Sequence, residues 1–182
     1  MATWFTPSNS VLWVVDVQTR MMSAVRESEL VITRVGQLLE AAVALGIPYC
    51  CSEQYPQGLG PTVPALQAYL QQQPAIEKTT FGAFANPEQR AILAQWGRSH
   101  VVVCGVEAHV CVAQTVLQGL AAGYTVGVVV DAVSSRHKQD AKMALRRLEQ
   151  QGAQLLTTES ILFEWLGDAK NPQFKAIQAL VK

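Results

Sequence analysis

The sequence has few charged residues and no excess of either sign. Lys, Arg, Asp and Glu make up 15% of the 182 residues, and 14 cations balance 14 anions. An average soluble domain is about 25% charged. Disordered chains combine high net charge with few apolar residues, whereas 49% of this sequence is hydrophobic, so we expect a folded chain. A net charge of zero supplies no surplus of cations for a phosphate backbone, so we expect no nucleic-acid partner.

Long apolar runs and targeting signals are also missing. No apolar stretch approaches the roughly 18 residues of a membrane-spanning helix, so no membrane partner is expected. Residues 1–9 have neither the basic flank nor the apolar stretch of a signal peptide. The four cysteines form no CxxC pair, and the adjacent Cys50 and Cys51 are typical of small buried hydrophobes. We therefore predict a cytoplasmic protein, and the low surface charge predicts a homo-oligomer.

Short apolar runs alternate with longer helical patterns along the whole chain, without repeats or linkers. Alternating strands and helices predict a parallel sheet covered by helices, joined by right-handed crossovers. We predict one domain, residues 1–182, with a three-layer α/β/α architecture and a Rossmann-like, six-stranded parallel sheet. The predicted strands are 11–16, 47–51, 75–78, 100–104, 125–130 and 153–156, and the longer predicted helices are 22–44, 112–122 and 136–151.

Three polar residues follow strands that border the expected ligand site. In open α/β sheets, ligands bind beyond the carboxyl ends of the strands where the strand order reverses, here between the first and fourth strands. Asp16 ends the first strand, Lys78 ends the third and Cys111 follows the fourth. Each has a structural alternative, since Asp16 could cap a turn, Lys78 could be solvated and Cys111 could be a packing residue. Their common position at one rim favours a functional site.

A carboxylate, an ammonium and a thiol at one rim predict nucleophilic catalysis. A thiol near a lysine and a helix N-terminus has a lowered pKa, so we expect Cys111 to be a thiolate at neutral pH. Asp16 can accept the thiol proton and later pass it to a leaving amine. The turn before Cys111 can direct backbone N–H groups at a developing oxyanion. This chemistry is that of a cysteine hydrolase with a thioester-type intermediate.

Several segments in this order resemble the isochorismatase-like cysteine hydrolase family. They are Val-Val-Asp-Val-Gln at 14–18, Lys-Thr-Thr-Phe at 78–81, Gly-Val-Glu-Ala-His-Val-Cys-Val-Ala-Gln-Thr at 105–115 and Asp-Ala-Val-Ser-Ser-Arg at 131–136. Each segment is weak alone, but the ordered set is specific and the similarity runs over nearly the whole chain. The resemblance implies the Rossmann-like isochorismatase-hydrolase fold.

The resemblance also implies roles for individual residues. It makes Asp16, Lys78 and Cys111 a catalytic triad. It further implies a cis peptide bond between Val106 and Glu107, which would direct the N–H groups of Glu107 and Cys111 into an oxyanion hole.

The loop at 52–62 departs from the metal-binding members of the family. Nicotinamidases bind a divalent metal there through His and Asp, whereas this loop has no histidine and one carboxylate. We therefore predict no metal and no cofactor, and nicotinamidase activity is not expected. The Glu-Gln-Tyr-Pro segment at 53–56 is closer to the uncharacterised isochorismatase-domain hydrolases.

The substrate is expected to be a small molecule, and several pocket residues are candidates. Phe81 and Phe84 are predicted to wall the pocket, Gln18 and Gln54 to hydrogen-bond an amide substrate, and His109 to line the pocket or to act structurally. Each could instead serve the core or the local backbone.

The predicted function is a metal-independent cysteine hydrolase that cleaves an amide-type C–N bond. Nitrile and imide carbons and the vinyl ether of isochorismate stay open as targets. A non-enzymatic small-molecule-binding module or scaffold of the same fold is the alternative. A nucleotide-binding module would need a glycine-rich phosphate loop after the first strand, and segment 16–20 has no glycine. Only an activity measurement would exclude a catalytically idle scaffold.

Overall fold

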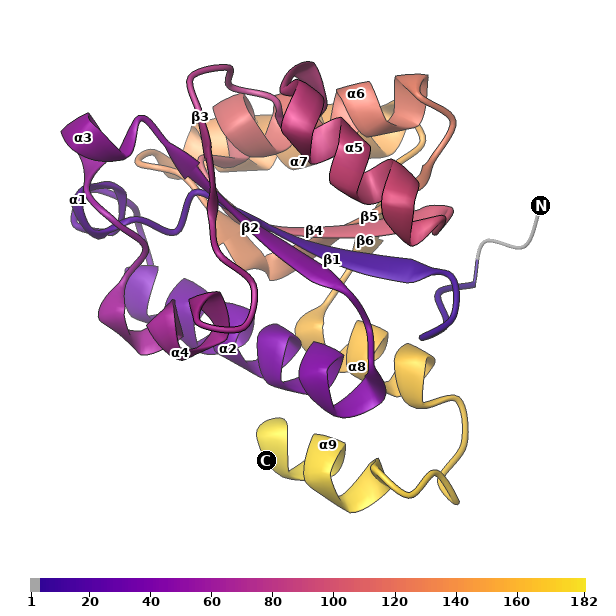
Figure 1. The fold of residues 1–182 in the computed structure, drawn as a ribbon. Coiled ribbons are helices and arrows are strands. Elements are labelled where there is room, and N and C mark those ends of the chain that lie inside the picture. Colours follow the sequence, from indigo (N-terminus) through magenta and orange to yellow (C-terminus); the bar gives the residue numbers. More distant parts are fainter. Residues whose placement is uncertain (1–3) are drawn as a thin grey trace.

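A parallel sheet lies between two layers of helices in the computed structural model, which describes residues 4–182 (Figure 1). The spatial order β3-β2-β1-β4-β5-β6 confirms the predicted six-stranded α/β architecture and the reversal between the first and fourth strands. The strands are β1 (Ser10–Val15), β2 (Tyr49–Gln54), β3 (Ile76–Lys78), β4 (His100–Val106), β5 (Thr125–Ser134) and β6 (Gln154–Leu156). Residues 1–3, part of the segment inspected for a targeting signal, lie outside the described range.

The helices cover both faces of the sheet and bury alternate strand residues. In β1, Leu12 and Val14 pack in the core on the α2, α8 and α9 side, whereas Trp13 and Val15 pack on the α5, α6 and α7 side (Figure 1). Within residues 4–182, no helix is both long and apolar enough to span a bilayer. The helices are α1 (Thr19–Met22), α2 (Ser28–Leu45), α3 (Pro56–Leu59), α4 (Gln67–Leu70), α5 (Pro87–Trp96), α6 (Ala113–Ala121), α7 (Lys138–Gln150), α8 (Thr158–Leu166) and α9 (Phe174–Leu180).

Several element boundaries differ from the predicted ones, and two of these differences bear on the carboxyl edge of the sheet. The helix expected from residue 22 begins at Ser28, because Glu27 has a left-handed backbone with φ of 55° that separates α2 from the short α1. The strand expected to end at residue 51 continues to Gln54, where it pairs with Lys78 of β3. The polar residues that end β2 keep strand geometry because they are buried and hydrogen-bonded at the carboxyl edge of the sheet.

Gly105 allows β4 to approach β1 closely at the point where the strand order reverses. It pairs with Val15, has φ of 114°, and a Cβ at this position would lie 2.1 Å from the carbonyl oxygen of Val15. Only glycine fits both this conformation and this spacing. The close approach brings the turn after β4, which contains Cys111, next to the end of β1.

Candidate active site

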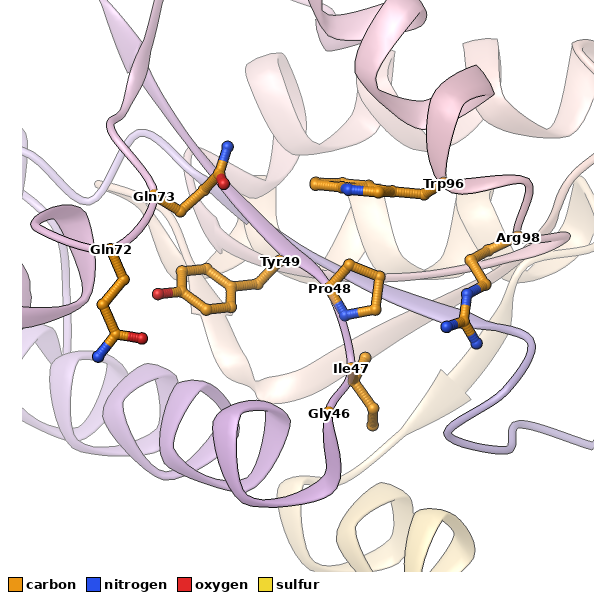
Figure 2. Close-up of a pocket in the computed structure, with 8 residues that line it drawn as sticks. All are labelled: Gly46, Ile47, Pro48, Tyr49, Gln72, Gln73, Trp96 and Arg98. Atoms are coloured by element: carbon orange, nitrogen blue, oxygen red, sulfur yellow. The ribbon is translucent and has the colours of Figure 1, made fainter.

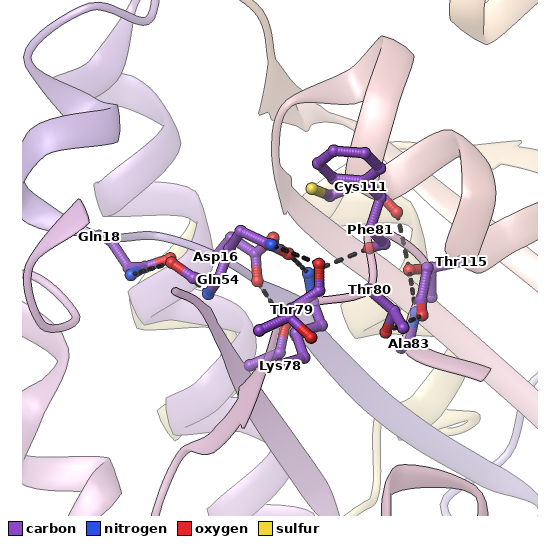
Figure 3. A network of polar contacts seen from close by, with 12 residues as sticks. Asp16, Gln18, Gln54, Lys78, Thr79, Thr80, Phe81, Ala83, Cys111 and Thr115 are labelled. Atoms are coloured by element: carbon purple, nitrogen blue, oxygen red, sulfur yellow. Dashed lines mark hydrogen bonds and ion pairs between the residues drawn. The ribbon is translucent and has the colours of Figure 1, made fainter. Parts of the chain in front are cut away.

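The structure brings Asp16, Lys78 and Cys111 together at the carboxyl ends of the strands (Figure 3). Asp16 directly follows β1, Lys78 is the last residue of β3, and Cys111 lies in a π-helical turn (Ala108–Val112) that leads from β4 into α6. The side chains are enclosed, with 0%, 3% and 3% of each residue exposed. Residues 62 positions apart in the chain therefore share one buried polar cluster.

Lys78 is held by three acceptors, one of which is Asp16. Its Nζ donates to Asp16 Oδ2 at 2.7 Å, to Gln54 Oε1 at 2.8 Å and to the carbonyl oxygen of Phe81 at 3.0 Å. An ammonium has three N–H donors, so all of them are used. Ser52 Oγ donates to the other carboxylate oxygen of Asp16, Oδ1, at 2.7 Å. The carboxylate is thus fixed from two sides.

Burial sets the protonation of both partners in the thiol–carboxylate pair. Burial raises the pKa of Asp16, although the charge and hydrogen bond of Lys78 offset part of that effect. The Cys111 thiol is hydrogen-bonded to Asp16, and burial together with the Asp16 charge raises its pKa to about 12. The expected thiolate at neutral pH is therefore wrong. Lys78 does lower the pKa of this thiol, but desolvation has the larger effect.

Thr115 ties the loop after β3 to the turn that carries Cys111. Its Oγ1 donates to the carbonyl oxygen of Cys111 at 2.7 Å and accepts from the backbone N–H of Ala83 at 3.1 Å (Figure 3). The same loop contains Phe81, whose carbonyl oxygen accepts a hydrogen bond from Lys78. Backbone contacts as well as side-chain contacts therefore connect Asp16, Lys78 and Cys111.

The turn before Cys111 has an unusual backbone and a buried carboxylate. The peptide bond between Val106 and Glu107 is cis. The Glu107 side chain accepts three hydrogen bonds from Arg136: Oε1 from the backbone N–H at 3.1 Å and from Nε at 3.2 Å, and Oε2 from Nε at 3.1 Å. The carbonyl oxygen of Glu107 also accepts from Val112 N at 3.2 Å. Hydrogen bonds to both the side chain and the backbone of Glu107 thus hold this turn next to the end of β5.

A pocket of about 500 Å³ opens above Cys111. Most of its wall is apolar, and its charged members are two arginines and one glutamate. The lining residues are Arg20, Met21, Ala24, Gln54, Leu59, Phe81, Glu107, Val110, Cys111 and Arg136. A largely apolar cavity with a few convergent polar groups is typical of a small-molecule site.

Two of the five predicted pocket residues line this cavity. Phe81 contributes an exposed ring to its wall, and Gln54 lines it while holding Lys78. Gln18 does not line it, because its amide is used within the loop after β2. Gln18 Nε2 donates to the carbonyl oxygens of Gln54 and Gly60, and its Oε1 accepts from Gln54 N.

Phe84 and His109 also lie away from this pocket. Phe84 is buried in the core, with ring centroids 6.4 Å from Trp13 and 5.4 Å from Tyr124, because the loop after β3 turns its ring under α6. His109 lies on the α7 side of the turn, where its Nδ1 is 3.0 Å from Ser135 Oγ. Phe84 therefore does not wall the pocket, and His109 takes the structural position that was its alternative to lining the pocket. Tertiary packing that sequence spacing does not encode places both side chains.

Sequence reasoning missed Ser52, Thr115 and the two pocket arginines. Ser52 lies one residue beyond the end of the predicted second strand, 47–51, and therefore falls in the predicted loop. Arg136 belongs to the recognised segment 131–136, but the predicted strand ended at residue 130, four residues before the end of β5. The second and fifth strands extend further than predicted because polar residues at their carboxyl ends are buried. Recognising these longer strands would have pointed to Ser52 and Arg136. No sequence signal marked Arg20.

Another pocket, of about 400 Å³, lies where β2 begins (Figure 2). Trp96 and Arg98 line it together with Pro48 and Tyr49. Its lining contains no cysteine, lysine, histidine or carboxylate, and the hydroxyl of its Tyr49 donates to the carbonyl oxygen of Tyr69 at 2.9 Å. Among residues 4–182, no group of three or more His, Cys, Asp and Glu side chains is positioned to hold a metal ion. The pocket above Cys111 is therefore the candidate active site.

Comparison with known proteins shows similarity over nearly the whole chain. The Isochorismatase domain model matches residues 10–160. Isochorismatase domain-containing protein 2 of Bos taurus is 43% identical over 176 residues, covering 97% of this chain and 84% of the relative. A structure described as the MAR1 ribonuclease of Caenorhabditis elegans is 40% identical with a TM-score of 0.92, covering 98% of this chain and 92% of the other.

The YcaC gene product of Escherichia coli is a more distant structural relative, described as an octameric hydrolase of unknown specificity. It is 27% identical with a TM-score of 0.91, and the match covers 98% of this chain and 89% of that one. Together these matches indicate a hydrolase, and they establish that the chain belongs to the isochorismatase domain family.

Proposed function

We propose that the chain is a metal-independent cysteine hydrolase that cleaves an amide-type C–N bond of a small molecule. One observation carries the proposal. The Cys111 thiol, at the base of an apolar pocket, is hydrogen-bonded to a carboxylate that is itself paired with Lys78. Family membership and the hydrolase described for the E. coli relative support the reaction class.

In the first half of the reaction, Cys111 Sγ attacks the carbonyl carbon of the substrate. The thiol proton passes to Asp16 as the S–C bond forms, so a thiolate is generated only during attack. The carbonyl electron pair moves onto oxygen, where the N–H groups of Glu107 and Cys111 are proposed to stabilise it. The C–N bond then breaks, the Asp16 proton goes to the leaving amine, and a thioester remains.

In the second half, water attacks the thioester. Asp16 takes a proton from the water, the C–S bond breaks, and the proton returns to Cys111 as the carboxylic acid leaves. Lys78 touches Asp16 but not the thiol proton in this scheme. Its positive charge holds the carboxylate in place and offsets part of the burial effect that raises the pKa of Asp16.

The proposed role of Asp16 predicts a characteristic pH dependence of thiol alkylation. With Asp16 intact, the rate of Cys111 alkylation by iodoacetamide should fall only when the pH drops through the raised pKa of this carboxyl, and should be nearly flat above it. In Asp16→Asn, the thiol has no base and its pKa stays raised by burial. The rate should then rise about tenfold per pH unit between pH 7 and 9, because only free thiolate reacts.

Mass spectrometry of the Cys111 peptide after timed quenching measures both profiles. Glu77→Gln serves as a matched control, because it removes an exposed carboxylate next to Lys78 in β3 and should keep the wild-type profile. Parallel profiles in wild type and Asp16→Asn would contradict Asp16 as the base.

The ribonuclease activity named for the C. elegans relative is not part of the proposal. A net charge of zero offers no excess of cations to an RNA backbone. The pocket of about 500 Å³ suits a small molecule.

We also propose that the chain is a homo-oligomer in the cytoplasm. The octameric relative, the 15% charged residues and exposed side chains such as Trp4, Phe81 and Met143 support the assembly. The four cysteines are unpaired, which suits a reducing compartment. Light scattering at micromolar concentration should give a mass several times 19.8 kDa, and a monomer would contradict the assembly.

A further inference from the structure

The candidate pocket is apolar along its walls and cationic at its rim. Cys111 lines the cavity and is buried, with 3% of the residue exposed. Met21, Leu59 and Val110 contribute apolar wall. Arg20 is exposed, and 57% of the Arg136 side chain is exposed, so the two guanidinium groups lie toward solvent. A ligand whose one end reaches the thiol would present its other end to these cations.

Arg136 is oriented in a way that leaves four of the five N–H donors of its guanidinium available. Its Nε and its backbone N–H are bound to Glu107. Its Nη1 and Nη2 groups make no hydrogen bond within the part of the chain that the structure describes. A guanidinium fixed through Nε presents its two terminal nitrogens as a fork, and such a fork matches the two oxygens of a carboxylate.

The charges around the pocket favour an anion over a cation. Glu107 is the single carboxylate in the lining, it is buried, and both of its oxygens already accept from Arg136. Arg20 adds a second cation, and its Nη1 donates to the carbonyl oxygen of Gly58 at 2.5 Å, which holds it over the pocket. One positive charge is therefore uncompensated in the lining.

From this arrangement we infer that the substrate is a small amide with an apolar body and a carboxylate at its far end, bound by Arg136 with the support of Arg20. The inference rests on the proposed function, because it takes Cys111 as the reacting atom. The apolar walls bind the body of the substrate, and the guanidinium fork sets its direction, with the amide toward the thiol. Arg136 would then determine specificity.

A pair of alkylating probes tests the inference without knowledge of the substrate. N-bromoacetyl-β-alanine ends in a carboxylate, and N-propyl bromoacetamide is a neutral molecule of similar size. With either probe, Sγ of Cys111 bonds to the CH₂ carbon, the thiol proton passes to Asp16 and bromide leaves. The readout is the ratio of the two Cys111 alkylation rates, divided by the same ratio for N-acetylcysteinamide in solution.

We expect the wild-type chain to prefer the acidic probe by about tenfold, the size of a good charge-assisted contact. Arg136→Gln should bring the ratio to about one, and Arg136→Lys should keep an intermediate preference because the charge remains. Loss of the contacts to Glu107 would slow both probes equally and leave the ratio unchanged. Arg146→Gln, which removes the same charge from the exposed face of α7, should keep the wild-type ratio.

The two proposals fail in different ways. A wild-type ratio of one, or an unchanged preference in Arg136→Gln, would overturn carboxylate recognition while leaving the hydrolase proposal intact. If neither probe alkylates Cys111, the proposed nucleophile itself is wrong.

Discussion

Cys111→Ala is expected to abolish alkylation of the folded chain by iodoacetamide, whereas the wild-type chain takes up one equivalent. Cys111 borders the pocket and is hydrogen-bonded to a base. The other thiols, Cys50, Cys51 and Cys104, are 0–1% exposed, and burial raises their pKa values, so they should not react in the native state. Intact-mass measurement of the native protein counts the label.

The same substitution should lower the hydrolysis of any accepted amide by roughly 10⁴-fold or more, because loss of a nucleophile removes the covalent route. Cys50→Ala is the matched control, since it also deletes a buried thiol but should still take up one equivalent. Persistence of the label in Cys111→Ala would assign the reactive thiol elsewhere.

Lys78→Met is expected to lower the free energy of unfolding by about 3–5 kcal/mol, because it leaves Asp16 as an unpaired buried carboxylate. Asp16 is 0% exposed, and the second Lys78 contact, to Gln54, is lost at the same time. Urea unfolding at pH 7 measures the change. Without Lys78, protonation of the Asp16 carboxyl removes the cost of burying its charge, and a protonated carboxyl cannot act as a base. The variant should therefore also lose Asp16-assisted alkylation of Cys111.

The double variant Asp16→Asn/Lys78→Met separates ion pairing from packing. It removes both buried charges, and replacing both members of a buried pair costs less than removing one. We expect it to recover more than half of the lost stability while remaining inactive. The hydrogen bond from Ser52 Oγ can still be accepted by the Asn oxygen. If Lys78→Met unfolds at the wild-type urea concentration, the pair does not stabilise the fold at this site.

The sequence alone determined the order of the elements and predicted the position of the candidate site. A continuous apolar run from residue 11 is typical of a strand buried on both faces, and Leu12 and Trp13 do pack against opposite helix layers. The parallel sheet and the reversal between its first and fourth strands followed from the alternation of strands and helices. Because parallel strands end at one edge, Asp16, Lys78 and Cys111 could be assigned to a common rim before any contact was known.

Only the tertiary structure decided the electrostatics of the site and the shape of its pocket. The raised pKa of Cys111 depends on how completely the surrounding elements exclude water, which residue spacing does not reveal. Gln18, Phe84 and His109 were directed away from the pocket, and Arg20 and Arg136 toward it, by loops whose paths depend on distant contacts. The periodicity of apolar residues in the sequence indicates which side of a helix or strand is buried. Desolvation and pocket lining arise from the packing of segments far apart in the chain, so they exist only in the folded protein.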